Sequence, residues 1–155
     1  MPTTQTSACR TLQYVFQIDI DASTEQVWTA LTEKIGLWWL GDFKILGSDS
    51  VTTLEPWPGG RLYEQNGDRG LLWYTVLSID PGSSLSLGGY CTPAFGGPLS
   101  TLITIELAEH DGGTRLQVGD ALFGHIDEQR ASSLESGWQQ LFDALRQYVE
   151  SQGSE

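Results

Sequence analysis

Apolar and polar residues alternate from Leu12 to Ile20, which is the period of a strand with one buried face. Directly after it, Ser23-Thr24-Glu25-Gln26 has the pattern of a capping box, because Ser23 can accept a hydrogen bond from the third helical amide and Gln26 can reach back. Apolar residues then recur at helical spacing. These patterns predict a first strand, a helix from Thr24 to about Glu33, and a second short helix that carries Leu37-Trp38-Trp39-Leu40.

From Phe43 onward the pattern changes to short segments of strand character separated by turn residues. The turn signals are Pro56-Trp57-Pro58-Gly59-Gly60, Asn66-Gly67, Asp80-Pro81-Gly82 and Asp111-Gly112-Gly113. Six predicted strands lie between them: Ser50 to Glu55, Arg61 to Gln65, Leu71 to Ile79, Ser83 to Tyr90, Thr101 to Ala108 and Thr114 to Leu122. Consecutive strands joined by tight turns predict an antiparallel meander.

The last apolar pattern is helical and runs from Asp127 to about Glu150. Its apolar residues recur at steps of three and four: Ala131, Leu134, Trp138, Leu141, Phe142, Leu145 and Val149. Most of the stability of such a helix comes from packing, so a sheet face must receive this apolar side. We therefore predict an α+β fold in which a long C-terminal helix closes over a curved antiparallel sheet of about six or seven strands.

The chain is strongly acidic, with 8 Lys plus Arg against 20 Asp plus Glu and a formal net charge of -12. Such a charge repels phosphate backbones and anionic lipids, since both interactions need clustered cations. We therefore expect neither nucleic acid nor a membrane surface as a partner.

A length of 155 residues suits one domain, which we place at residues 12–150, between a loosely ordered N-terminus (1–11) and a polar tail (151–155). The N-terminus lacks the apolar stretch of a signal peptide, and no run of about 18 apolar residues occurs. Cys9 and Cys91 stand alone and are expected as free thiols. These features predict a cytoplasmic protein, either a monomer or a homodimer.

The chain carries no nucleophile elbow, no phosphate-binding glycine loop and no HExxH motif. Two histidines, His110 and His125, are too few and too scattered to build a zinc site. We expect no metal and no cofactor. His110 lies beside a turn and reads as a solvated loop residue, whereas His125 lies between the last strand and the long helix, where it could contact a ligand.

Aromatic residues are the most informative class for function, because the chain has six Trp and each brings a large apolar face with one indole donor. The helical register of Trp28 and Trp138 points them toward the core, while aromatic residues on the strands could either pack or face a bound molecule. The candidate ligand-binding residues are Trp39, Tyr63, Trp73, Tyr74, Tyr90, Phe95, His125 and Trp138.

Two further features leave alternatives open. Gly137 interrupts the C-terminal helix at a cost of about 1 kcal/mol relative to alanine, so that either a sheet side chain packs against its bare backbone or a pocket is widened there. The loop from Cys91 to Pro98 brackets Phe95 with prolines and glycines. Phe95 is either part of a mobile lid or a fixed plug at the end of the sheet.

The order of strand, two helices, six-strand meander and long helix is that of the helix-grip, or START-like, fold. Several segments resemble the SRPBCC superfamily, which includes START-like lipid-transfer domains and polyketide cyclases, and within it the homologues of the activator of heat-shock-protein-90 ATPase. These segments are Ser23 to Thr32, Trp38-Trp39, Pro58 to Glu64, Val76 to Pro81 with Leu85, Gly113 to Leu116, and Gly137-Trp138 with Leu141 and Leu145.

This resemblance implies that the protein binds an apolar or amphipathic small molecule in a cavity between the sheet and the C-terminal helix. Tyr74 stands where many members have glycine, which implies a narrower cavity. The sequence lacks the separate chaperone-binding domain of the true activator, so co-chaperone activity is not expected.

Two other functions stay open. One is a cyclase-like or hydrolase-like enzyme that uses polar groups in the same cavity, with its acid or base among Arg61, Tyr63, Glu64, Tyr90 and His125. The other is a stress-related or chaperone-related interaction module that uses the acidic surface.

Overall fold

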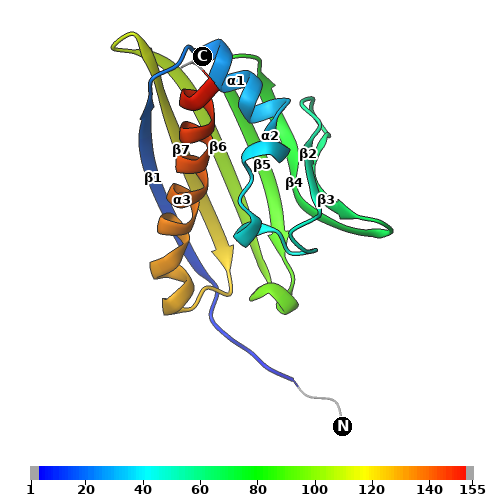
Figure 1. Cartoon of the computed structure of the whole chain (residues 1–155). Coiled ribbons are helices and arrows are strands. Elements are labelled where there is room, and N and C mark those ends of the chain that lie inside the picture. The colour runs from blue at the N-terminus through cyan, green and yellow to red at the C-terminus, as the bar shows by residue number, and fades with distance from the viewer. Residues whose placement is uncertain (1–3, 153–155) are drawn as a thin grey trace.

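Seven strands form one antiparallel sheet in the computed structural model, which describes residues 4–152 (Figure 1). The strands are β1 (Arg10–Ile20), β2 (Val51–Leu54), β3 (Arg61–Asn66), β4 (Arg69–Asp80), β5 (Ser84–Cys91), β6 (Leu99–His110) and β7 (Gly113–Gly124). Their order across the sheet is β1-β7-β6-β5-β4-β3-β2, so β2 to β7 are a meander and β1 pairs with its last strand. The predicted fold is confirmed. Of the predicted loose N-terminus and polar tail, residues 1–3 and 153–155 lie outside the described residues.

The described residues also form three α-helices and two single 3-10 turns: α1 (Thr24–Thr32), α2 (Ile35–Trp38), η1 (Gly41–Phe43), η2 (Pro93–Phe95) and α3 (Glu128–Gln152). The capping box of α1 is confirmed, since the amide of Gln26 donates to Ser23 Oγ at 3.1 Å and the amide of Ser23 donates to Gln26 Oε1 at 2.9 Å. The short second helix starts two residues earlier than predicted and ends before Trp39.

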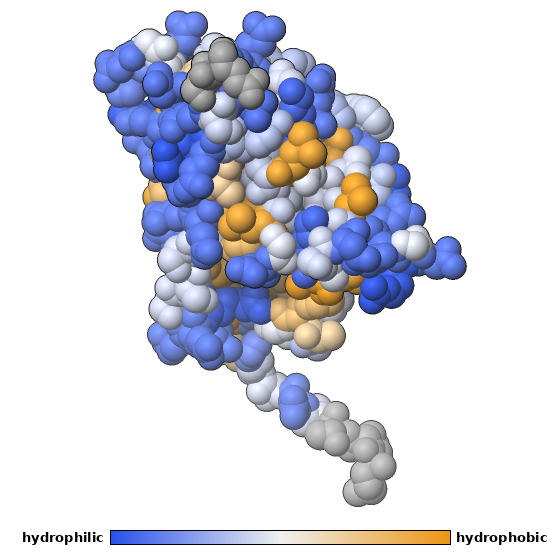
Figure 2. Space-filling view, viewed as in Figure 1, coloured by the Kyte–Doolittle hydropathy of each residue, from blue (hydrophilic) through white to orange (hydrophobic). Residues whose placement is uncertain are grey.

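α3 lies across the concave face of the sheet, with α1 and α2 on the same side (Figure 1). Its fully buried residues, Leu141, Phe142, Leu145 and Val149, all belong to its C-terminal half. In the N-terminal half, Ala131, Leu134 and Trp138 are only half-buried. The outer side of the helix is largely hydrophilic, and hydrophobic residues show beside it (Figure 2). The helix is thus packed tightly at one end and loosely at the other.

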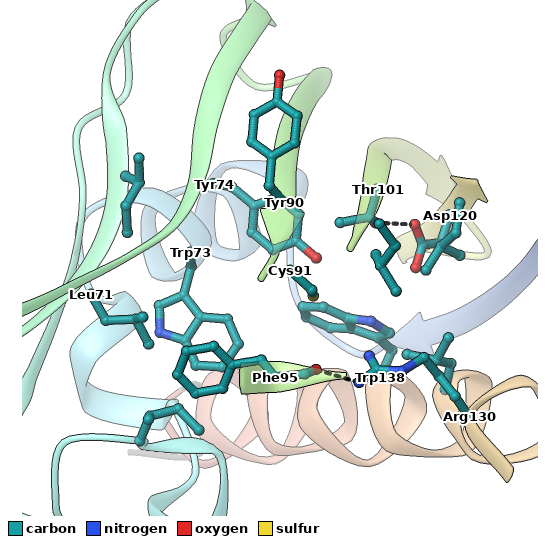
Figure 3. Close-up of a pocket in the computed structure, with 15 residues that line it drawn as sticks. Leu71, Trp73, Tyr74, Tyr90, Cys91, Phe95, Thr101, Asp120, Arg130 and Trp138 are labelled. Atoms are coloured by element: carbon teal, nitrogen blue, oxygen red, sulfur yellow. Dashed lines mark hydrogen bonds between the residues drawn. The ribbon is translucent and has the colours of Figure 1, made fainter. Parts of the chain in front are cut away.

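A β-bulge in β4 turns two consecutive aromatic residues toward the concave face. Leu62 pairs with Tyr74 but the next residue, Tyr63, pairs with Leu72, so that Trp73 is an extra residue in β4. An extra residue shifts the alternation of side chains by one position. For this reason Trp73 and Tyr74 both face the helix, as Figure 3 shows.

Gly137 lies in the loosely packed part of α3. A Cβ atom at this position would meet only Cε1 of Phe43, at 4.0 Å, which is an ordinary van der Waals contact. Phe43 belongs to η1, so the expected packing of a sheet side chain against this glycine is wrong. The residue is also absent from the lining of the cavity described below, so the alternative of a widened pocket fails too.

Gly137→Ala should therefore stabilise the protein by about 0.5 to 1 kcal/mol, because alanine restricts the unfolded chain and meets no obstacle in the helix. Urea unfolding of the two proteins measures this. Gly89→Ala is the matched control, since a Cβ there would approach the Trp73 carbonyl oxygen to 2.6 Å and the Tyr74 ring to 2.7 Å. That variant should be destabilised, and a loss of stability in Gly137→Ala would contradict the packing seen here.

Candidate functional site

A cavity of about 250 Å³ lies between the loosely packed half of α3 and strands β4 to β7 (Figure 3). Its wall is mainly apolar or aromatic, with a few polar groups. The fifteen lining residues are Ile45, Leu71, Leu72, Trp73, Tyr74, Tyr90, Cys91, Phe95, Leu99, Thr101, Asp120, Leu122, Arg130, Leu134 and Trp138. A largely apolar concavity with a few convergent polar groups is the usual form of a small-molecule site.

Asp120 is the buried carboxyl of this wall, with only 4 % of its surface exposed. Tyr14 lies directly opposite it on β1, and the Tyr14 hydroxyl donates to Asp120 Oδ2 at 2.7 Å. Thr101 reaches it from β6 and donates to Oδ1 at 2.6 Å. The register of β1, β7 and β6 thus builds a three-residue polar cluster at the sheet side of the cavity.

Burial raises the pKa of the Asp120 carboxyl above its ordinary value, although the hydrogen bonds from Thr101 and Tyr14 act in the opposite direction. Burial, reinforced by the nearby negative charge of Asp120, also raises the pKa of the Tyr14 and Tyr74 hydroxyls. Both tyrosines therefore stay protonated and can donate hydrogen bonds. A hydrogen bond from the backbone of Ala121 acts on the pKa of Asp120 in the same direction as those from Thr101 and Tyr14.

Tyr74 and Trp138 divide the space under α3. Their ring centroids lie 6.1 Å apart, and both rings line the cavity as well as a second void of about 20 Å³ deeper in the core. The ring of Phe142 follows Trp138 at 6.0 Å and closes the void from the helix side. The two aromatic rings therefore set the inner limit of the cavity.

Glu64 fixes the wall at Trp73. Its carboxylate is fully buried and accepts hydrogen bonds from four donors: the amide of Ile45 at 3.1 Å, the amide of Leu46 at 2.6 Å, Ser50 Oγ at 2.8 Å and Trp73 Nε1 at 3.1 Å. Burial by itself would raise the pKa of this carboxyl, but the hydrogen bonds outweigh burial and hold the pKa below its usual range. Glu64 is therefore an ionised structural anchor.

The loop from Cys91 to Pro98, with its turn η2, lies at the same end of the sheet as the start of α3 (Figure 1), and it contributes Cys91 and Phe95 to the cavity. Phe95 lines the cavity and is 44 % exposed. The guanidinium of Arg130 on α3 donates to the Phe95 carbonyl oxygen, as the dashed line in Figure 3 shows. Gly96 has a φ of 90°, and a Cβ atom there would collide with the Arg130 guanidinium. Loop and helix are thus in direct contact.

Five of the eight predicted ligand-binding residues line this cavity: Trp73, Tyr74, Tyr90, Phe95 and Trp138. Tyr90 contributes only to the rim, because its side chain points away from the cavity and the residue is 81 % exposed (Figure 3).

The structure places the other three outside the cavity wall. Trp39 is buried behind Trp73, with ring centroids 5.6 Å apart. Tyr63 lies on the opposite face of the sheet, under the guanidinium of Arg61. His125 is half-buried, and its Nδ1 lies 3.4 Å from Ser7 Oγ.

The polar site residues that the sequence interpretation missed are Thr101, Asp120 and Arg130, and Asp120 is the one that a sequence signal could have revealed. The signal was present in β7, where the buried positions alternate as Thr114, Leu116, Val118, Asp120 and Leu122, so that one carboxyl occupies an otherwise apolar or neutral series. Of the acid or base candidates singled out instead, Tyr90 lies only at the rim and the other four lie outside the cavity wall. Arg61 forms an ion pair with Glu55 at 2.7 Å, and the carboxylate of Glu64 already accepts hydrogen bonds from four donors.

Within residues 4–152, no three His, Cys, Asp or Glu side chains are grouped so that they could hold a metal ion. Of the helices in this part of the chain, none combines the length and hydropathy needed to cross a bilayer. Cys91 is half-buried in the cavity wall, and Cys9 is exposed; both are free thiols.

The sheet order, the gripping helix and the cavity under it define a helix-grip protein of the SRPBCC superfamily, a class known for ligand binding. The chain belongs to the family described as "Activator of Hsp90 ATPase homolog 1-like protein", whose model matches residues 21–150. The resemblance inferred from the sequence motifs is confirmed.

Solved structures share this fold at low sequence identity. Protein MLL2253 from Mesorhizobium loti is 22 % identical with a TM-score of 0.65, over 90 % of this chain and 97 % of that one. A protein from Rhizobium leguminosarum is 19 % identical with a TM-score of 0.69, over 93 % and 97 % of the two chains. A search of curated proteins finds no match.

Proposed function

We propose that the protein binds an apolar or amphipathic small molecule in the cavity between α3 and strands β4 to β7. The observation that carries this proposal is the cavity itself, which has a volume of about 250 Å³ and a mainly apolar wall. It lies beneath the N-terminal half of α3, whereas the C-terminal half of this helix is tightly packed against the core. Apolar surface that faces a space rather than other side chains is stabilised when a ligand covers it.

The arrangement of polar groups supports an oriented ligand. Asp120 and Thr101 lie on the sheet side and Arg130 lies on the helix side, so the ends of a bound molecule meet different chemistry (Figure 3). Glu64 holds the Trp73 ring in place from behind, and Tyr74 with Trp138 limits how deep a molecule reaches. Such fixed walls favour binding, because little side-chain freedom is lost when the ligand enters.

The neutral fluorophore N-phenyl-1-naphthylamine tests this proposal in a titration at neutral pH. The wild-type protein should give a saturable rise in fluorescence. Leu134→Trp, which fills the cavity from α3, should weaken binding at least about tenfold, a change of about 1.4 kcal/mol. The matched control is Leu102→Trp on the convex face, where the leucine is 47 % exposed, and it should bind like the wild type.

A second readout uses the thiol in the cavity wall. In a Cys9→Ser background, the fluorophore should slow the reaction of Cys91 with N-ethylmaleimide, because a bound molecule covers this half-buried side chain. Absence of saturable binding by the wild type, or equal weakening by the two tryptophan variants, would contradict the proposed site.

A further inference from the structure

Arg130 is one of two arginines in residues 4–152 whose described partner is a neutral backbone carbonyl, and the other, Arg69, lies outside the cavity wall. Four other arginines form ion pairs with carboxylates: Arg10 with Glu128, Arg61 with Glu55, Arg115 with Asp19, and Arg146 with Asp143 and Glu150. Arg130 donates instead to the backbone carbonyl of Phe95. Among the described residues, no carboxylate lies within ion-pair distance of it, although the chain carries 20 acidic residues.

Arg130 lies where it can reach a molecule bound in the cavity. Of the fifteen residues that line the cavity, Arg130 is the one basic residue, and it lies at the mouth beside Phe95 (Figure 3). Its own backbone amide is bonded to Asp127 Oδ1 at 2.7 Å, so the start of α3 is already capped. The guanidinium carries five N–H donors, and the contact with Phe95 uses a single nitrogen. Donors therefore remain for a second acceptor without any change in the loop.

From this geometry we infer that the ligand is an amphipathic acid whose carboxylate binds Arg130 at the mouth while its apolar body lies in the cavity. This inference rests on the proposed function. A guanidinium matches a carboxylate in shape and can bind it through two parallel hydrogen bonds, which are stronger than neutral ones. The partly apolar surroundings reduce competition from water.

The net charge of the protein excludes one other explanation for a preference for acids. A net charge of -12 repels anions and attracts cations at long range, so a preference for an acid cannot come from the overall field. A buried carboxyl, Asp120, also lines the cavity and would favour an amine if it were the group that selects the ligand. A preference for acids must therefore come from a local contact with Arg130.

Three molecules with the same chain and different heads test this: octanoate, 1-octanol and octylamine, each used to displace N-phenyl-1-naphthylamine at pH 7.5 and low salt. We expect octanoate to bind at least about tenfold more tightly than 1-octanol, since a charge-assisted hydrogen bond replaces a neutral one, and octylamine to bind no better than 1-octanol. Added salt should reduce the advantage of octanoate.

Arg130→Gln should abolish the preference for octanoate over 1-octanol, and Arg130→Lys should retain part of it because the charge remains. The matched control is Arg69→Gln, since Arg69 also donates to a backbone carbonyl, that of Leu46, but lies outside the cavity wall. It should keep the full preference. If Arg130 only tethered the loop, Arg130→Gln would change the affinities for the acid and the alcohol by the same factor.

The outcomes separate this inference from the proposed function. Equal displacement by octanoate and 1-octanol, or tightest binding of octylamine, would overturn the role of Arg130 while leaving apolar binding in place. Failure of all three molecules to displace the fluorophore, with no saturable binding of the fluorophore itself, would overturn both.

Discussion

Glu64→Gln should lower the free energy of unfolding by about 3 kcal/mol or more, although the two side chains have nearly the same shape. The carboxylate accepts four hydrogen bonds, two on each oxygen, from Ile45 and Trp73 on one side and from Leu46 and Ser50 on the other. A glutamine turns one oxygen into a donor, so that at least one buried N–H group is left facing another N–H group. Hydrogen bonds to a charged group are worth about 1.5 to 3 kcal/mol each, and a buried unsatisfied donor costs about 1 to 3 kcal/mol.

Urea unfolding at neutral pH measures this loss, with Glu106→Gln as the control. Glu106 is an exposed glutamate on β6, so its substitution should change the stability by less than about 0.5 kcal/mol. A similar small change in Glu64→Gln would contradict the anchoring role of Glu64. The fluorescence of Trp73 should also change in the folded variant, because its indole loses the described acceptor.

The same variant has a defined pH dependence. The pKa of Glu64 is lower in the folded protein than in the unfolded chain, so its contribution to stability is present above the unfolded pKa and is lost as the pH falls through the folded pKa. The difference in stability between wild type and Glu64→Gln should therefore be largest near neutral pH and should shrink in acid. A difference that grows on acidification would contradict an ionised Glu64.

The elements of the fold could be predicted because each rests on a local pattern. The alternation in β1, the capping box at Ser23 and the turn at Asp111-Gly112 each specify one element, and the glycine-containing turns leave little freedom in how neighbouring strands pair. Asp111 and Gly112 both have positive φ, as a tight hairpin turn requires. The long helix could be predicted because its apolar positions keep one period over several turns.

The candidate site could be predicted only in part, because its geometry depends on contacts between distant segments. Tyr14 and Asp120 are 106 residues apart and become neighbours only through the register of β1 and β7. The bulge at Trp73 reverses the alternation of β4, and neither composition nor periodicity marks where a strand gains an extra residue. In the sequence, Arg130 looks like any other polar residue of a helix, because its contact with Phe95 exists only in the folded protein. Aromatic residues on strands could be identified, but not the face to which each belongs.

Two leucines of α3, seven residues apart, should respond very differently to the same truncation. Leu141→Ala should cost about 2 to 5 kcal/mol, because Leu141 has no exposed surface and its removal leaves a new cavity in a packed core. Leu134→Ala should cost less than about 1.5 kcal/mol, because Leu134 is half-buried and already faces an open space. Urea unfolding of both variants, with the exposed Gln140→Ala as a control for helix propensity, measures the two costs.

The difference between these two costs tests the architecture on which binding depends. If α3 were packed evenly along its length, both truncations would cost several kcal/mol and no room would exist for a ligand. If α3 did not grip the sheet, Leu141→Ala would cost less than about 1 kcal/mol. A large loss at Leu141 with a small one at Leu134 is expected only when the helix is anchored at its C-terminal half and leaves a cavity beneath its N-terminal half. Addition of N-phenyl-1-naphthylamine should then stabilise wild type and Gln140→Ala alike, because a ligand that binds only the folded state shifts the unfolding equilibrium.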